Sequence, residues 1–203
     1  MGGTILLEIY LFVNPLGGKC LASERTILKL ARELPEKISY QFIPLLSMQM
    51  GHTHNASLAE RNQAYQDRYR TILDYKAALF QGKKRGRQFL IRLQDTMIEN
   101  ELSYSEDLAT LVADATHLDM DMFLEDRHSE IARKSFITDQ RLAAEMGIQH
   151  PSTAVFYNAL SEDAGLKVEE ISYPIVKEVC ESQGFSINEA QEEYGSRNNF
   201  RVL

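Results

Sequence analysis

The pattern of apolar and polar positions near the N-terminus predicts a strand, a helix and a second strand. Residues 9–13 form an apolar run rich in β-favouring side chains, and Asn14-Pro15 ends it. Apolar residues then recur at helical spacing over residues 20–34, while Glu24 and other charged residues fall on the face expected to meet water. Residues 38–43 alternate like a half-buried strand and stop at Pro44. This region therefore predicts a βαβ unit.

The middle of the chain, from about residue 56 to 146, changes to a helical pattern. Apolar residues recur at helical spacing over 64–80, 88–97 and 108–115. Ser105 and Ser129 suit the N-caps of later helices, and Gly147 suits a helix end. The pattern predicts an all-helical segment.

Strand signals return after Gly147. Residues 153–157 read as a buried strand, and residues 166–171 alternate, so the two favour a hairpin. Pro174 is placed to open a final helix that Gly184 ends. The order is therefore βαβ, a helical segment and ββα, which predicts an α/β fold. The residues after 186 are polar and look poorly packed.

The chain contains two cysteines, Cys20 and Cys180. Cys20 falls in the first turn of the first predicted helix, where the partial positive charge of the helix N-terminus stabilises a thiolate. Lys19 acts in the same direction, so the sequence predicts a lowered pKa for Cys20. Cys180 lies in the predicted C-terminal helix and reads as a buried structural thiol.

Composition limits the function classes. The chain has 203 residues, of which 44% are hydrophobic and 25% charged, as is usual for a globular protein. Its net charge of −7 argues against non-specific nucleic-acid binding, and the basic run from Lys83 to Arg87 reads as a solvated helix start. Glu8 interrupts the N-terminal apolar run, so neither a signal peptide nor a membrane segment is expected. With so few cysteines, a reducing, cytoplasmic location is expected.

Metal and cofactor signals are weak. His52 and His54 lack a second pair of ligands with tight spacing. The acidic cluster that begins at Asp119 fails as a calcium loop, because Leu124 stands where the turn needs glycine. No phosphate-binding or dinucleotide-binding glycine motif is present. The sequence therefore predicts no cofactor and no metal.

The segment from Asn14 to Cys20, NPLGGKC, resembles the D-P-x-C-x-x-C turn of the DsbA and FrnE-type thioredoxin-fold oxidoreductases. The stretches GKKRGRQFLIRLQDTMIENE, EIARKSFITDQRLAAEMGI and HPSTAVFY extend that resemblance over most of the chain. The resemblance implies a thioredoxin-like fold with a large DsbA-type helical insertion. It places a thioredoxin-like domain at residues 1–48 and 148–186, the insertion at 49–147 and a polar tail at 187–203.

The resemblance also implies the site residues. Pro151 corresponds to the family's cis-proline, which precedes the third strand and faces the helix that carries Cys20. His150 is either a group that tunes the thiol or an ordinary loop histidine. Gly17 stands where the family has its first cysteine, so Gly17, Gly18 and Lys19 form a degenerate active-site turn. Dithiol exchange through this turn is excluded, because exchange needs a second thiol to release the product.

Two function classes compete. The chain resembles the SpxH (YjbH) group of DsbA-like adaptors, which implies an adaptor that binds the regulator Spx and promotes its degradation by the ClpXP protease. The alternative is a one-cysteine thiol-disulfide oxidoreductase or a glutathione-transferase-like enzyme that uses Cys20. Exposure of the Cys20 sulfur discriminates between them, because a buried sulfur is inert whatever its pKa.

Overall fold

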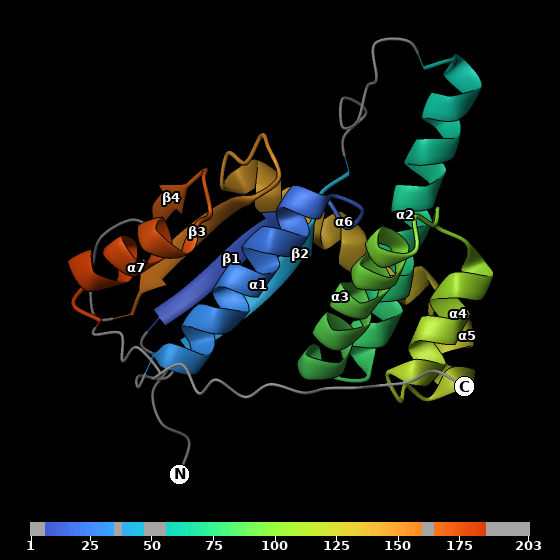
Figure 1. Cartoon of the computed structure of the whole chain (residues 1–203), viewed down its shortest axis with the longest axis horizontal. Coiled ribbons are helices and arrows are strands. Elements are labelled where there is room, and N and C mark those ends of the chain that lie inside the picture. Colours follow the sequence, from blue (N-terminus) through green and yellow to red (C-terminus); the bar gives the residue numbers. More distant parts are fainter. Residues whose placement is uncertain (1–6, 35–37, 47–55, 160–164, 186–203) are drawn as a thin grey trace.

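A computed structural model of the chain describes residues 7–34, 38–46, 56–159 and 165–185. These residues form a mixed sheet and a set of helices that extends to one side of it (Figure 1). In chain order the elements are β1 (Leu7–Val13), α1 (Gly18–Glu33), β2 (Ile38–Pro44), α2 (Leu58–Phe80), α3 (Lys83–Glu99), α4 (Glu106–Ala115), α5 (Met120–Asp126), α6 (Glu130–Glu145), β3 (Thr153–Asn158), β4 (Leu166–Val168) and α7 (Tyr173–Ser182). The predicted order of strands and helices is confirmed.

The sheet has the strand order β2-β1-β3-β4. Strand β1 pairs in parallel with β2, with Leu7 opposite Ile38, and antiparallel with β3, with Leu7 opposite Asn158. Strand β4 pairs antiparallel with β3, so the predicted hairpin is confirmed. It covers only residues 166–168, because the chain bends away from the sheet at Glu169 and Glu170. Within the described part of the chain, β2 and β4 are the edge strands.

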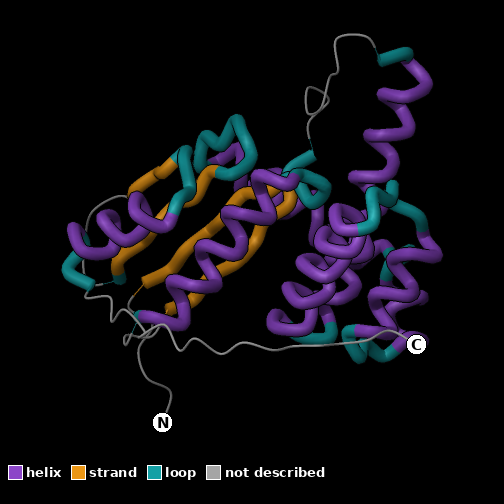
Figure 2. Tube along the Cα trace, viewed as in Figure 1, coloured by secondary structure: helices purple, strands orange, loops and turns teal. Residues whose placement is uncertain are grey.

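Both faces of the sheet are covered by helices. On one face, alternate residues of β1 pack with Ile27 and Leu30 of α1 and with Val176 of α7. On the other face, Phe12 packs with Ala143 of α6. Figures 1 and 2 show α1 and α7 in front of the sheet and α6 behind it. Because both faces are covered, β1 is almost entirely apolar and reads as a continuous hydrophobic run.

A second core lies among α2, α3, α4 and α5. Its buried residues include Phe89 and Phe123, whose ring centroids lie 5.4 Å apart. The predicted caps are confirmed, since the hydroxyls of Ser105 and Ser129 accept backbone N–H groups at the starts of α4 and α6. Gly147 adopts a φ of 63°, as a helix-ending glycine does.

Helix α2 begins earlier than the sequence pattern predicts. It starts at Leu58 instead of residue 64, after a capping box formed by Ser57 and Glu60. Residues 58–63 are exposed, so they carry no apolar periodicity from which a helix could be predicted. The cap residues, rather than the hydrophobic pattern, mark the beginning of this helix.

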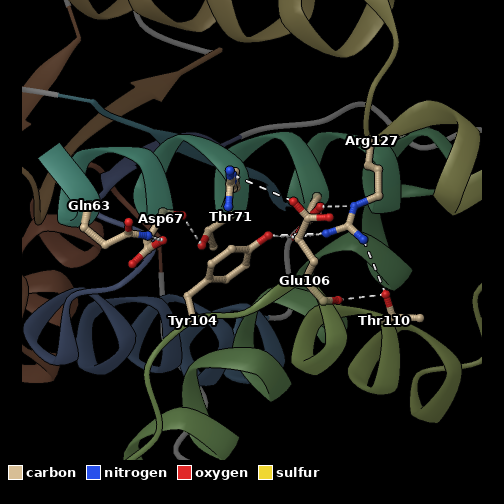
Figure 3. A network of polar contacts seen from close by, with 9 residues as sticks. Gln63, Asp67, Thr71, Tyr104, Glu106, Thr110 and Arg127 are labelled. Carbon is tan, nitrogen blue, oxygen red and sulfur yellow. Dashed lines mark hydrogen bonds and ion pairs between the residues drawn. The ribbon is translucent and has the colours of Figure 1, made fainter.

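A buried polar network connects the segments that form the second core. The carboxylate of Asp74 on α2 accepts two hydrogen bonds from Arg127, at 2.7 and 3.0 Å, and one from the Tyr104 hydroxyl at 2.7 Å. Figure 3 shows Tyr104 and Arg127 approaching this point from different segments. The network therefore ties α2 to the chain before α4 and to the end of α5.

Several features predicted from the sequence lie outside the described residues. These are the polar tail at 187–203 and the pair His52 and His54. Of the helices described, none is both long enough and apolar enough to cross a membrane. Within the same ranges, no three His, Cys, Asp or Glu side chains are grouped so that they could hold a metal ion.

Candidate functional site

The turn from Asn14 to Gly17 delivers the chain from β1 into α1. The Gly17 N–H donates to the Asn14 carbonyl at 3.0 Å, and the Leu16 N–H donates to Asn14 Oδ1 at 3.2 Å. Gly17 is the N-cap of α1, with extended backbone angles of φ −104° and ψ 117° and no side chain to cap the helix. Cys20 therefore lies in the first turn of α1, where the sequence predicted it, and Gly18 and Lys19 beside it are exposed.

The Cys20 thiol is enclosed by protein. Only 2% of Cys20 is exposed. Its Sγ accepts the Asn14 N–H at 3.1 Å and lies 3.2 Å from the Oγ of Ser152. Burial raises the pKa of Cys20, and this effect outweighs the hydrogen bonds from Ser152 and Asn14, which lower it. The predicted lowering of this pKa is wrong, because a helix N-terminus cannot offset the loss of water around a buried thiolate.

The loop before β3 differs from the family pattern at Pro151. The described residues contain no cis peptide bond, so the predicted cis bond before Pro151 is wrong and the bond is trans. The neighbouring Ser152 adopts a φ of 63°, which turns the chain into β3, and its N–H donates to the Phe12 carbonyl at 2.7 Å. This left-handed residue supplies the change of direction, and Ser152 supplies the contact to Cys20.

Sequence reasoning missed Ser152 as a site residue. Ser152 is 1% exposed, and its hydroxyl is directed at the thiol. Its position next to Pro151 was the available signal, because the family places that loop opposite the helix start. His150 is exposed, and its carbonyl accepts the Thr153 hydroxyl at 2.9 Å. The structure places no His150 contact on Cys20, which favours the ordinary loop histidine.

A small hollow lies beside the position of the missing thiol. It has a volume of about 170 Å³ and is lined by Leu16, Gly17, Gln94, Met97, Ile98 and Leu102. Ile98 is 54% exposed and Leu102 46% exposed, so two large apolar side chains flank the turn at the surface. Cys20 does not line this hollow. The turn therefore presents an apolar concavity in place of a reactive sulfur.

Beneath the turn, α1 and α3 share a buried polar pair. Glu24 on α1 is fully buried, and its Oε1 accepts a hydrogen bond from Gln94 Nε2 on α3 at 3.2 Å. Burial raises the pKa of Glu24 from 4.5 to about 8. The sequence prediction that Glu24 faces water is wrong, because α3 packs across the face of α1 that a βαβ unit alone leaves open.

Proteins similar to this chain in sequence include ClpXP adapter proteins. The chain is 33% identical over 196 residues to the ClpXP adapter protein SpxH of Bacillus licheniformis, a match that covers 85% of this chain. It spans 65% of the length of that relative. Further SpxH proteins match at similar identity. The resemblance to this group of DsbA-like proteins is confirmed.

Two solved structures with the same fold are named for thiol-disulfide chemistry. The cytosolic disulfide reductase DsbM from Pseudomonas aeruginosa superposes with a TM-score of 0.64 at 15% identity, over 87% of this chain and 98% of its own. The thiol-disulfide exchange protein α-DsbA2 from Wolbachia pipientis superposes with a TM-score of 0.59 at 14% identity, over 89% of this chain and 83% of its own. These likenesses confirm the predicted thioredoxin-like fold with a DsbA-type arrangement.

The family assignment depends on a match that runs through most of the described fold. The sequence profile described as thioredoxin matches residues 10–178, from β1 into α7. That range contains the turn at Gly17, the buried Cys20 and the loop at Ser152. The chain belongs to the thioredoxin family.

Proposed function

We propose that this protein is an adaptor that binds the regulator Spx and promotes its degradation by the ClpXP protease. The observation that carries the proposal is the state of the turn at Gly17, where the one thiol, Cys20, is buried. The similarity to adapters named for ClpXP supports the same role. A cytoplasmic location is part of the proposal, since both partners must meet the adaptor in one compartment.

The alternative enzyme has little chemical support at this site. A thiol-disulfide oxidoreductase or glutathione-transferase-like enzyme needs an accessible thiolate. Cys20 is enclosed and its pKa is raised, so the reactive form is scarce at neutral pH. Gly17 offers no side chain that could resolve a mixed disulfide or orient a bound thiol. An adaptor requires neither group.

The apolar hollow at the turn is the candidate contact surface for the partner. Leu16, Ile98 and Leu102 surround a concavity that a partner's apolar side chain would fill. Burial of such a side chain on binding removes exposed apolar surface from water. The proposal therefore assigns partner binding to the place where relatives perform thiol exchange.

The test is a degradation assay with purified Spx and ClpXP. Addition of the protein should accelerate the loss of Spx. Cys20→Ser should act as well as the unaltered protein, because the thiol takes no part. Ile98→Glu combined with Leu102→Glu should slow the reaction, because two charges would enter the apolar contact. Ile131→Glu, at an exposed position of α6, is the matched control and should have no effect.

Two results would contradict the proposal. If the unaltered protein leaves the rate of Spx loss unchanged, the adaptor role is wrong. If Cys20→Ser abolishes the acceleration while circular dichroism shows an intact fold, then the thiol is required and the premise that the buried Cys20 takes no part is wrong.

A further inference from the structure

A large groove lies beside the edge strand β2, away from the turn at Gly17. It has a volume of about 790 Å³ and lies between α1, β2 and α3, with the end of α4 closing one side. Ile38 and Tyr40 of β2 form part of its lining. The proposed adaptor contact at the turn does not use this groove, so its role is a separate question.

The groove concentrates positive charge in a chain with a net charge of −7. Four cationic side chains line it, Arg32 from α1 and Lys84, Arg87 and Arg92 from α3. Within the described ranges none of the four forms an ion pair with a carboxylate. The lining carboxylate, Asp95, is already paired with Arg25 at 2.5 Å. The groove is therefore complementary to an anionic ligand.

One of the four groove cations, Lys84, lies in the first turn of α3, where positive charge has a cost to the helix. Helix α3 begins with Lys83, Lys84 and Arg85, and its first turn contains no acidic residue. Positive side chains at a helix N-terminus oppose the helix dipole and destabilise the helix. Local helix stability therefore does not explain the positive residues in this turn. Two residues of the basic run, Lys84 and Arg87, line the groove, and the run also forms the exposed helix start that the sequence predicts.

The backbone of β2 divides into a covered half and an open half. One edge of β2 pairs with β1, and the other edge faces away from β1. On that outer edge, the carbonyls of Phe42 and Pro44 accept hydrogen bonds from Tyr75 on α2 and Gln140 on α6, so this half is covered. Because N–H and C=O directions alternate along a strand, Ile38 and Tyr40 present their backbone groups on that same edge. No described residue is bonded to those groups there. The open half is the half that lines the groove.

We propose that this groove binds an acidic, extended segment of a partner protein. The segment adds to the open edge of β2 through the backbone groups of Ile38 and Tyr40, as an additional strand. Its carboxylates pair with Lys84, Arg87 and Arg92 on α3. Arg87 is already held over the Tyr40 ring, 4.3 Å from its centroid, so one cation is positioned beside the edge before the ligand arrives.

The experiment uses a fluorescein-labelled peptide of alternating Glu and Val, about eight residues long, the length of a long strand. Fluorescence anisotropy with the full chain should show saturable binding that weakens as salt is raised. Lys84→Glu, Arg87→Glu and Arg92→Glu combined should weaken binding at least about tenfold. The matched control is a triple variant of α6 with the same change of charge at three exposed positions, Arg133→Glu, Lys134→Glu and Arg141→Glu. This control variant should bind the peptide as the unaltered protein does.

Two further peptides test the mode of binding. A version with Lys in place of Glu should not bind. A version N-methylated at alternate residues should lose affinity, because it cannot pair with the strand edge. The proposal is overturned if the α3 variant binds like the control while circular dichroism shows both folded, or if the N-methylated peptide binds unchanged. It is also overturned if a single-stranded DNA oligonucleotide of the same charge binds as tightly, since the groove would then be a nucleic-acid site. None of these outcomes depends on Spx degradation.

Discussion

The Sγ of Cys20 lies 3.2 Å from the Oγ of Ser152, across the junction between α1 and the loop that enters β3. Both side chains are almost completely enclosed, and the Asn14 N–H completes the surroundings of the sulfur. The contact gives the buried thiol a polar partner. The site therefore holds the start of α1 and the loop before β3 together.

The first prediction concerns the reactivity of Cys20. In the native protein, Ellman's reagent should modify neither Cys20 nor Cys180, because both are buried. In denaturant both thiols should react. The measurement is the absorbance released per chain in each condition. Rapid modification of the native protein, mapped by mass spectrometry to Cys20, would show that the sulfur is accessible after all.

A second prediction concerns Ser152. The hydrogen bond from Ser152 lowers the pKa of Cys20, although burial raises it more. Ser152→Ala should therefore raise the thiol pKa further and should reduce the free energy of unfolding by about 0.5–1.5 kcal/mol, through the lost hydrogen bond. Ultraviolet absorbance of the thiolate against pH measures the first effect, and urea unfolding the second. Ser103→Ala, at an exposed position, is the control and should change neither quantity.

A third prediction concerns the missing cysteine at position 17. Gly17→Cys should restore a pair of thiols separated by one helical turn. The backbone angles at Gly17 suit any L-residue, and an added Cβ would lie 3.3 Å from Asn14 Nδ2, a contact that a small shift of the Asn14 side chain relieves. Mild oxidation should close a disulfide between residues 17 and 20, and the variant should reduce insulin with dithiothreitol as the electron donor.

The control for this variant is Gly18→Cys. Residue 18 is exposed, but it is two positions from Cys20, and residues two apart on a helix do not face each other. That variant should gain one reactive thiol, no disulfide and no insulin reduction. Failure of Gly17→Cys to form the disulfide, with the fold intact, would mean that the turn has lost the geometry of a dithiol site as well as its sulfur.

Most of the fold could be predicted because its signals are local. The apolar run of β1, the glycine stop at Gly147 and the serine caps each depend on a few neighbouring residues. The errors concern contacts between distant segments. Glu24 is buried because α3 crosses α1, and Cys20 is enclosed because the Ser152 loop covers it. The residues next to Glu24 and Cys20 in sequence carry no pattern from which either contact could be predicted.

A fourth prediction follows from the buried carboxyl of Glu24. Its pKa is raised from 4.5 to about 8, so the folded protein keeps this proton between those pH values while the unfolded chain releases it. The free energy of unfolding should therefore fall as pH rises from 4.5 to 8, by a few kcal/mol. Glu24→Gln should remove this fall in the free energy of unfolding. The variant should therefore be more stable than the unaltered protein at pH 8 and about as stable at pH 4.5. Urea unfolding across this pH range measures the difference.

The matched control is Glu99→Gln, at an exposed position of α3. It should leave the pH dependence unchanged, because Glu99 is exposed and the variant keeps the buried Glu24. Parallel pH profiles for Glu24→Gln and the unaltered protein would show that Glu24 is ionised in the fold.

The last prediction concerns the buried ion pair of Asp74 and Arg127, which the Tyr104 hydroxyl completes. Asp74→Ala should reduce the free energy of unfolding by about 3–5 kcal/mol, because it leaves the buried guanidinium without its carboxylate. Asp74→Leu, Tyr104→Phe and Arg127→Met combined should recover most of that loss, since apolar groups of similar size need no partner. Asp114→Ala, at an exposed position of α4, is the control and should change stability little. If the triple variant is no more stable than Asp74→Ala in urea unfolding, then packing around these side chains, rather than the unpaired charge, accounts for the cost.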